Sequence, residues 1–450
     1  MLDNPITEII NTASNLKAVN LIEADNRADE LLNPPPVLAK EGYHGILREV
    51  ARIATAHSEA SPVAIAANFI GTFSAMIGRA SYQYIGDGLC HPRPFFLITG
   101  RTGKARKGTA EFTVRKIFDA VEVKLGFVTL ARHEGGAGSG EGLGYAVRDI
   151  EEGNTGGTDD KRLLLIEAEF AGLMANASRD KSTLSATIRT AWDGKTISPL
   201  VKNSMWAATD PHICLIGHIT APELIGKMSD VDALSGFLNR FIILHVARAR
   251  LVPLPKPTSP EDIDRVASII AELVCFATNG DVTAKNTKRI DLSHAAMKFW
   301  CEEYPALTAE QDGIAGALLV RTEIYARMLA MVFALMDKSS LIEVVHIKAA
   351  LAWVNYWKAS VTYIFQTLSA KAESERLNEN AADVLEFIRK NSGCSRSAIT
   401  TAFKHSKLSS IQMTGILNHL MNSAPPLIRQ QQLARADGKP GKGAIVFWIK

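Results

Sequence analysis

The chain has 450 residues, more than one hydrophobic core usually supports, so several domains are expected. Its composition, 47% hydrophobic and 22% charged, is that of a globular protein and excludes fibrous and disordered classes. No apolar run is long enough for a transmembrane helix, and the amino terminus lacks the pattern of a secretory signal. The five cysteines are scattered without a CxxC pair, which argues against a zinc site or disulfides and predicts a cytoplasmic location.

Positive charge is concentrated at the carboxyl end of the chain. Residues 381–450 carry ten Lys and Arg against three Asp and Glu, a net charge of +7. Since the whole chain carries +3, residues 1–380 carry −4. A basic tail on an acidic body favours a nucleic-acid-binding module, because phosphate neutralisation dominates such binding. A solvated charged surface is the alternative, and composition does not decide between them.

The first 80 residues read as a linker followed by helices. Pro34, Pro35 and Pro36 predict a stiff linker, and apolar residues then recur at helical spacing from His44 to Arg79. Ser61 and Pro62 are typical of a helix start.

From residue 81 to about 250, short apolar runs alternate with amphipathic segments. This alternation predicts an α/β domain with a largely parallel sheet covered by helices. The expected strands are 95–99, 163–166, 213–216 and 241–246.

A proline-rich stretch from Leu251 to Pro260 predicts a domain boundary. Residues 260–375 read as a helical lid, in which Trp353 and Trp357 are expected to pack. Residues 381–450 read as three helices closed by a hairpin, the pattern of a winged helix.

The segment between the expected strand 95–99 and the helix expected from Ala110 has the parts of a phosphate-binding loop. Such a loop needs glycines, a lysine for the outer phosphates and a hydroxyl for Mg²⁺, in front of a helix amino terminus. Its spacing departs from GxxxxGK[ST], because Arg106 stands at the usual lysine position; a surface loop is the alternative. The candidate nucleotide-binding residues are Gly100, Gly103, Lys104, Lys107, Gly108 and Thr109.

The expected strand 163–166 is followed by two carboxylates, Glu167 and Glu169. In P-loop enzymes an acid at this place holds Mg²⁺ and a neighbouring acid polarises the attacking water. Either glutamate could be the metal-side acid.

Taken in order, these segments resemble the AAA+ P-loop core of the minichromosome maintenance helicases, and more closely the helicase-like ATPases of phages, plasmids and genomic islands. The resemblance runs from about Phe95 to Ala359, with a winged helix after it. Besides the phosphate loop and the acidic strand end, it rests on segments 138–149, 184–198, 216–220, 236–241 and 320–323.

The resemblance implies roles for further residues. His218 or Thr220 would be the sensor-1 residue. Arg240 would be an arginine finger, and Arg321 (or Arg327) the sensor-2 arginine, both acting on the nucleotide of a neighbouring subunit. A surface ion pair is the alternative role for each arginine.

The resemblance also implies contacts with DNA. Lys202 would lie at or near the DNA-contacting position of the pre-sensor hairpin. In the basic tail the candidate DNA-binding residues are Arg396, Lys404, Lys407, Lys439 and Lys442.

The sequence therefore predicts an ATP-dependent DNA helicase or translocase that uses ATP and Mg²⁺. It would act as a hexamer in replication of a mobile genetic element, on single-stranded or forked DNA, with a primase or other replication protein as a possible partner. Four departures from the family keep alternatives open: the shifted phosphate loop, Glu-Ala-Glu in place of Asp-Glu, His218 or Thr220 in place of the usual Asn at sensor 1, and no amino-terminal DNA-binding and zinc domain. The alternatives are an ATP-switched initiator or loader without motor activity, and an interaction or defence protein with a degenerate site.

Overall fold

The computed structural model describes residues 35–100, 107–126, 128–151, 156–199, 206–228, 236–310, 313–403, 410–422, 426–433 and 444–450. For 366–379 and 410–412 it describes the backbone only. The chain divides into two compact units, Met1–Phe365 and Gln366–Lys450.

The larger unit is built on a five-stranded parallel sheet. Its strands, in spatial order, are β4 (Ala131–Glu134), β5 (Arg162–Glu167), β6 (His212–Ile219), β3 (Phe95–Thr99) and β7 (Ile242–His245). Every neighbouring pair is parallel. The predicted α/β class is therefore confirmed at this level, as a parallel sheet flanked by helices of the kind found in Rossmann-like and P-loop-like cores.

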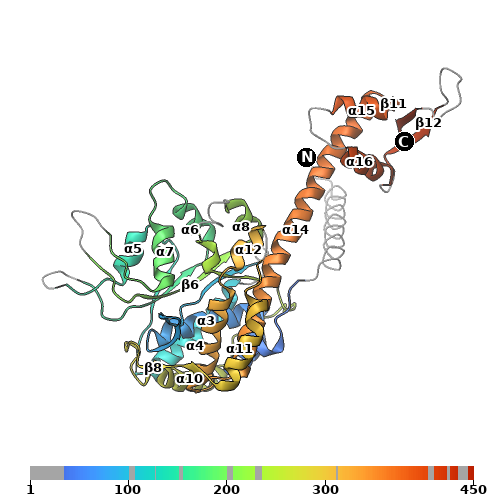
Figure 1. Cartoon of the computed structure of the whole chain (residues 1–450). Coiled ribbons are helices and arrows are strands. Elements are labelled where there is room, and N and C mark those ends of the chain that lie inside the picture. Colours follow the sequence, from blue (N-terminus) through green and yellow to red (C-terminus); the bar gives the residue numbers. More distant parts are fainter. Residues whose placement is uncertain are drawn as a thin grey trace, which may run out of the picture. The chain divides into compact units, whose positions relative to one another are not determined.

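Helices cover both faces of this sheet (Figure 1). On one face lies α3 (Pro62–Ile77), which is buried along almost its whole length and packs on β6, β5 and β3. Gly71 allows that approach, since a Cβ there would lie 2.9 Å from Ile216. On the other face Phe170 of α6 (Phe170–Ala177) lies over Gly217, where a Cβ would lie 2.5 Å from its ring. Burial on both faces explains why the central strands are continuously apolar.

Further elements complete the larger unit. Beside α3 lies α4 (Lys107–Lys124), which was expected to become helical only from Ala110. Phe112 lies on the outer side of α4 and is 59% exposed. The remaining elements up to residue 245 are η1 (Lys40–Tyr43), α2 (Ile46–Thr55), β1 (Ser81–Ile85), β2 (Gly88–Cys90), α5 (Gly140–Ala146), α7 (Leu184–Asp193), α8 (Ala221–Lys227) and η2 (Leu238–Arg240).

The helices after the proline-rich stretch pack onto the same unit. The first, α10 (Pro260–Thr278), contacts α4 and α3 directly. The indole rings of Trp353 and Trp357 are fully buried, as expected for packing residues. In the part of the chain that the structure covers, no helix has both the length and the apolarity to cross a membrane. The other elements are β8 (Lys288–Arg289), β9 (Asp291–Leu292), α11 (His294–Leu307), α12 (Gly313–Leu319), α13 (Thr322–Met336), β10 (Leu341–Ile342) and α14 (Val344–Lys390).

The smaller unit contains the end of α14, two further helices and an antiparallel sheet. The helices are α15 (Arg396–Ala402) and α16 (Ser410–Asn422). The sheet has the order β11 (Cys394–Ser395), β13 (Ile445–Ile449), β12 (Ile428–Gln432). Its core joins all these elements: Ala381, Val384, Ile388, Ile399, Met413, Ile416, Leu417, Leu420, Ile428 and Phe447.

One buried hydroxyl connects three segments of the larger unit. Tyr325 of α13 accepts hydrogen bonds from the backbone N–H of Phe95 (3.2 Å) and from the indole N–H of Trp192 (2.8 Å). It donates to the carbonyl of Arg240, 2.5 Å away. The hydroxyl therefore fixes the start of β3 against α7 and η2.

The substitution Tyr325→Phe is expected to lower the free energy of unfolding of the larger unit. Two buried N–H donors would lose their acceptor, and each such loss costs about 1–3 kcal/mol. Chemical denaturation measures the change. Tyr304→Phe on α11 is the matched control, since Tyr304 is 45% exposed and its change should stay within about 0.5 kcal/mol. Equal stability of the two variants would contradict the role of the Tyr325 hydroxyl.

Candidate functional site

The candidate nucleotide-binding residues lie at the carboxyl edge of the parallel sheet. Gly100 follows β3 directly and is buried. Gly103 and Lys104 lie outside the described residues, and α4 begins at Lys107. Ligands of open parallel sheets bind at this edge, where strand ends meet helix amino termini.

Lys107 reaches across the strand ends in the first turn of α4. Its ammonium donates to the carbonyl of Ile219, at the end of β6, over 2.6 Å. Burial lowers the pKa of Lys107 to about 8, and the negative charge of Glu223 opposes that shift. The described partner of this half-buried ammonium is a neutral backbone carbonyl. Lys107 can therefore exchange this partner for a charged phosphate oxygen.

Two histidines lie on either side of β3 at the same edge. His218 on β6 is 5% exposed, and its Nε2 has no hydrogen-bond partner in the described part of the chain. His245 ends β7 beside Thr99, and its buried Nδ1 likewise has none among the described residues. Burial, with the positive charge of Lys107 as the second cause, lowers the pKa of each to about 4. His218 was a predicted site residue. His245 was missed, because only the strand order brings it next to β3.

The two predicted acids have different surroundings. Glu167 at the end of β5 is 3% exposed and accepts hydrogen bonds from the backbone N–H groups of Gly136 (3.2 Å) and Ala137 (2.9 Å). Glu169 is exposed at the N-cap position of α6, and Thr109 is exposed in the first turn of α4. Carboxylate and hydroxyl oxygens are ligands that Mg²⁺ prefers. Glu167, Glu169 and Thr109 could therefore hold the ion directly or through water.

The two predicted arginines lie at the opposite, amino edge of the sheet. Arg240 precedes β7 and is 8% exposed; its guanidinium donates to Asp193 (3.0 Å) and to the carbonyl of Gly236 (2.6 Å). Arg321 donates to Asn239 (3.1 Å). Five residues of β3 at about 3.3 Å each separate the two edges by roughly 15 Å. Neither arginine can therefore reach a phosphate bound beside Gly100 of its own chain.

Trp192 of α7 lies close to both guanidinium groups. Its ring centroid is 4.7 Å from the Arg321 guanidinium carbon and 5.4 Å from that of Arg240. Burial lowers the pKa of Arg321, and the neighbouring charge of Arg240 lowers it further. The indole face attracts both cations and keeps them together despite their repulsion.

The predicted DNA-binding residues are only partly described. Ile197 and Ala208 form an antiparallel bridge after α7, on either side of the segment that contains Lys202; Lys202 itself lies outside the described residues. Arg396 begins α15 and donates to the Thr414 hydroxyl on α16. The other predicted positions, Lys404, Lys407, Lys439 and Lys442, also lie outside the described residues.

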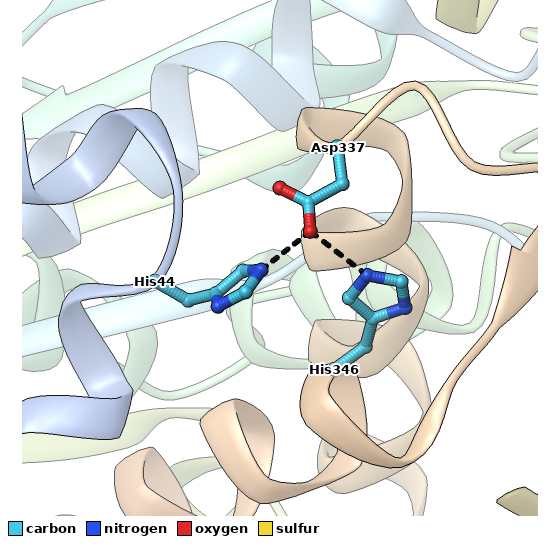
Figure 2. A group of neighbouring side chains, drawn as sticks. All are labelled: His44, Asp337 and His346. Carbon is cyan, nitrogen blue, oxygen red and sulfur yellow. Dashed lines mark hydrogen bonds and ion pairs between the residues drawn. The ribbon is translucent and has the colours of Figure 1, made fainter.

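A second cluster, which the sequence did not predict, joins His44, Asp337 and His346 (Figure 2). One Asp337 oxygen lies 2.5 Å from Nε2 of His44 and 3.1 Å from Nε2 of His346. The backbone N–H of Glu343 donates to Nδ1 of His346 (2.9 Å), so the ring carries its proton on Nε2, toward Asp337. A metal-bound histidine donates from its other nitrogen, so this arrangement does not fit a metal ligand. The cluster is a hydrogen-bonded clasp between η1, α13 and α14.

No protein-family model matches the chain, and a search of curated proteins finds no match. The function therefore has to be argued from the geometry of the site.

The substitution Asp337→Asn is expected to lower the free energy of unfolding by about 1–3 kcal/mol at neutral pH, because hydrogen bonds to a charged acceptor are lost. The hydrogen bonds from the two histidines hold the pKa of Asp337 well below its usual value, against the opposite effect of burial. Because the pKa of Asp337 is lower in the folded protein, its carboxylate stabilises the fold at pH values above its unfolded-state pKa. This stabilisation is lost as pH falls toward the folded-state pKa. The difference between wild type and variant should therefore narrow below about pH 4.

Urea unfolding between pH 3 and 7 measures this difference. Zn²⁺ or a chelator should leave the wild-type Tm unchanged. A clear rise of Tm with Zn²⁺ that Asp337→Asn abolishes would show that the cluster binds metal after all.

Proposed function

We propose that the chain is an AAA+ P-loop ATPase that moves along DNA, as the resemblance to the minichromosome maintenance helicases implies. One observation carries the proposal. The strand with the polar sensor residue, β6, lies between the strand that leads into the phosphate loop, β3, and the strand that ends in Glu167, β5. This order puts lysine, sensor and acid side by side, as in-line phosphoryl transfer requires.

The start of α4 at Lys107 supports Lys107 as the phosphate-binding lysine, in preference to Lys104. A P-loop lysine lies at the beginning of the helix, where the helix dipole adds to its attraction for phosphate. Gly108 and Thr109 follow in the same turn, and in this proposal the Thr109 hydroxyl would contact Mg²⁺. Relative to the usual spacing counted from Gly100, Lys107 lies one position late and Thr109 two positions late, because Gly108 separates them.

In this proposal Glu167 and Glu169 have different roles. Glu167 accepts hydrogen bonds from two backbone N–H groups, and other lone pairs of its carboxylate can accept from Mg²⁺-bound water. Glu169 is exposed and free to polarise the attacking water. When bound, Mg²⁺ offsets charge on the phosphate oxygens.

The position of Arg240 and Arg321 supports their action in trans. Each lies on the edge that faces away from its own phosphate loop, so only the next subunit's nucleotide is within reach. Arg240 would leave Asp193 on contact with that phosphate. A homo-hexameric ring would complete every site in this way. The DNA contacts in this proposal are the segment that contains Lys202 and the basic carboxyl-terminal unit, which we interpret as a winged helix. Replication of a mobile genetic element, beside a primase or another replication protein, remains the proposed setting.

The inward ion pair of Arg240 with Asp193 favours one alternative, an ATP-switched initiator or loader that assembles without turnover. In that case nucleotide would bind at Lys107, but Arg240 would stay paired within its own subunit. ATP-dependent assembly with negligible hydrolysis would support this alternative.

Lys107→Ala is expected to reduce ATP hydrolysis by roughly 10²–10³-fold, because the charge that stabilises the transferred phosphoryl group is lost. Steady-state phosphate release, with and without single-stranded DNA, measures the effect. Lys116→Ala is the control, an exposed lysine on the same helix that should keep wild-type turnover. Wild-type activity in Lys107→Ala would refute the assigned site.

Arg240→Ala is expected to lower turnover by about 10³–10⁵-fold if the finger acts in trans. A mixture of Arg240→Ala with Lys107→Ala should regain activity, because about a quarter of the interfaces then pair an intact lysine with an intact arginine. Arg289→Ala, an exposed arginine paired with Asp291, serves as the control for substitution and mixing. No recovery on mixing would argue against action in trans.

A further inference from the structure

We infer that His245 takes up a proton when a polyphosphate binds at the carboxyl edge, so that nucleotide affinity at this site rises as pH falls below neutrality. The inference rests on the proposed function and adds to it a titrating residue and a form of regulation.

The position of His245 is the first argument. The strand β7 pairs with β3 so that His245 lies opposite Thr99, the last residue before Gly100. The ladder continues one step further, since the backbone N–H of Val246 donates to the carbonyl of Thr99 over 2.8 Å. His245 is therefore fixed beside the entry to the phosphate loop by backbone hydrogen bonds that a bound ligand need not disturb.

The second argument is that one of its ring nitrogens is buried without a partner. Within the described residues no group hydrogen-bonds to Nδ1 of His245. A buried polar atom without a partner costs free energy, so it is satisfied when a suitable group arrives. A phosphate oxygen is such a group when the ring nitrogen carries a proton, as it does in the Nδ1–H tautomer of the neutral ring and in the imidazolium. The negative charge of the phosphate favours the imidazolium.

The surroundings of His245 hold it neutral while no anion is bound. The positive charge of Lys107 on α4 disfavours the protonated imidazole of His245 in addition to burial. The negative charge of Glu223 on α8 acts in turn on Lys107. His218 on β6 feels the same lysine. On α14, the ring of Tyr363 lies 4.6 Å from the imidazole, and the Tyr356 hydroxyl donates to the His245 carbonyl. The pKa of Tyr356 is raised by burial, so its hydroxyl brings no negative charge at neutral pH.

A bound polyphosphate adds negative charge to this environment. Its negative charge offsets Lys107 and favours the protonated imidazole. A group whose pKa is higher in the complex than in the free protein strengthens binding as pH falls. The association constant should gain up to about tenfold per pH unit, over the range from the pKa of the complex down toward the free value of about 4.

The test is calorimetric titration of the full chain with ADP and with a non-hydrolysable ATP analogue, between pH 5 and 7, in two buffers of different ionisation enthalpy. This range lies below the titration of Lys107. Wild type should take up more protons than His245→Gln, and affinity should rise more steeply in wild type as pH falls. His133→Gln on the exposed edge strand β4 is the control and should behave as wild type. The ligand's own protonation cancels in these comparisons, because it is the same for every protein.

The outcomes separate the two proposals. Nucleotide binding with equal proton uptake in wild type and His245→Gln would overturn the role of His245 and leave the proposed function standing. No nucleotide binding by the wild type at any pH would overturn both. If His245→Gln does not fold, the wild type decides alone: proton uptake no greater than the free nucleotide's own titration predicts overturns the inference.

Discussion

The pairing of β3 between β6 and β7 determines where the candidate residues lie. A strand buried on both faces and paired on both sides cannot shift its register without moving apolar residues out of the core. The ends of β3 are therefore fixed, and every chain segment that leaves or enters the sheet beside them is fixed too. Lys107, His218 and His245 meet at one end, while Arg240, Arg321 and Trp192 meet at the other.

The sequence predicted the central strands because their residues are continuously apolar, as burial on both faces demands. It missed β4 (Ala131–Glu134), whose residues after Ala131 are polar and which lies at the exposed edge of the sheet. It also placed the start of the helix after the phosphate loop too late, because Lys107, Gly108 and Thr109 lack apolar periodicity although they form its first turn.

The sequence did not predict contacts between residues that are far apart along the chain. His44 and Asp337 are 293 positions apart, and no local spacing indicates that they touch. The proximity of His245 to the end of β3 depends on the order β6-β3-β7, and a list of strands does not contain that order. By contrast, Glu167 could be predicted, because a carboxylate directly after an apolar strand is a local pattern.

A chain with half a nucleotide site on each edge of its sheet has a consequence for assembly in the proposed function. The phosphate edge of one chain must face the arginine edge of the next for the site between them to be complete. Contacts of this head-to-tail kind either close into a ring or continue as an open helix, depending on the rotation between neighbours. Dilution would then separate lysine from arginine, and turnover per chain would fall with protein concentration even though each subunit stays folded.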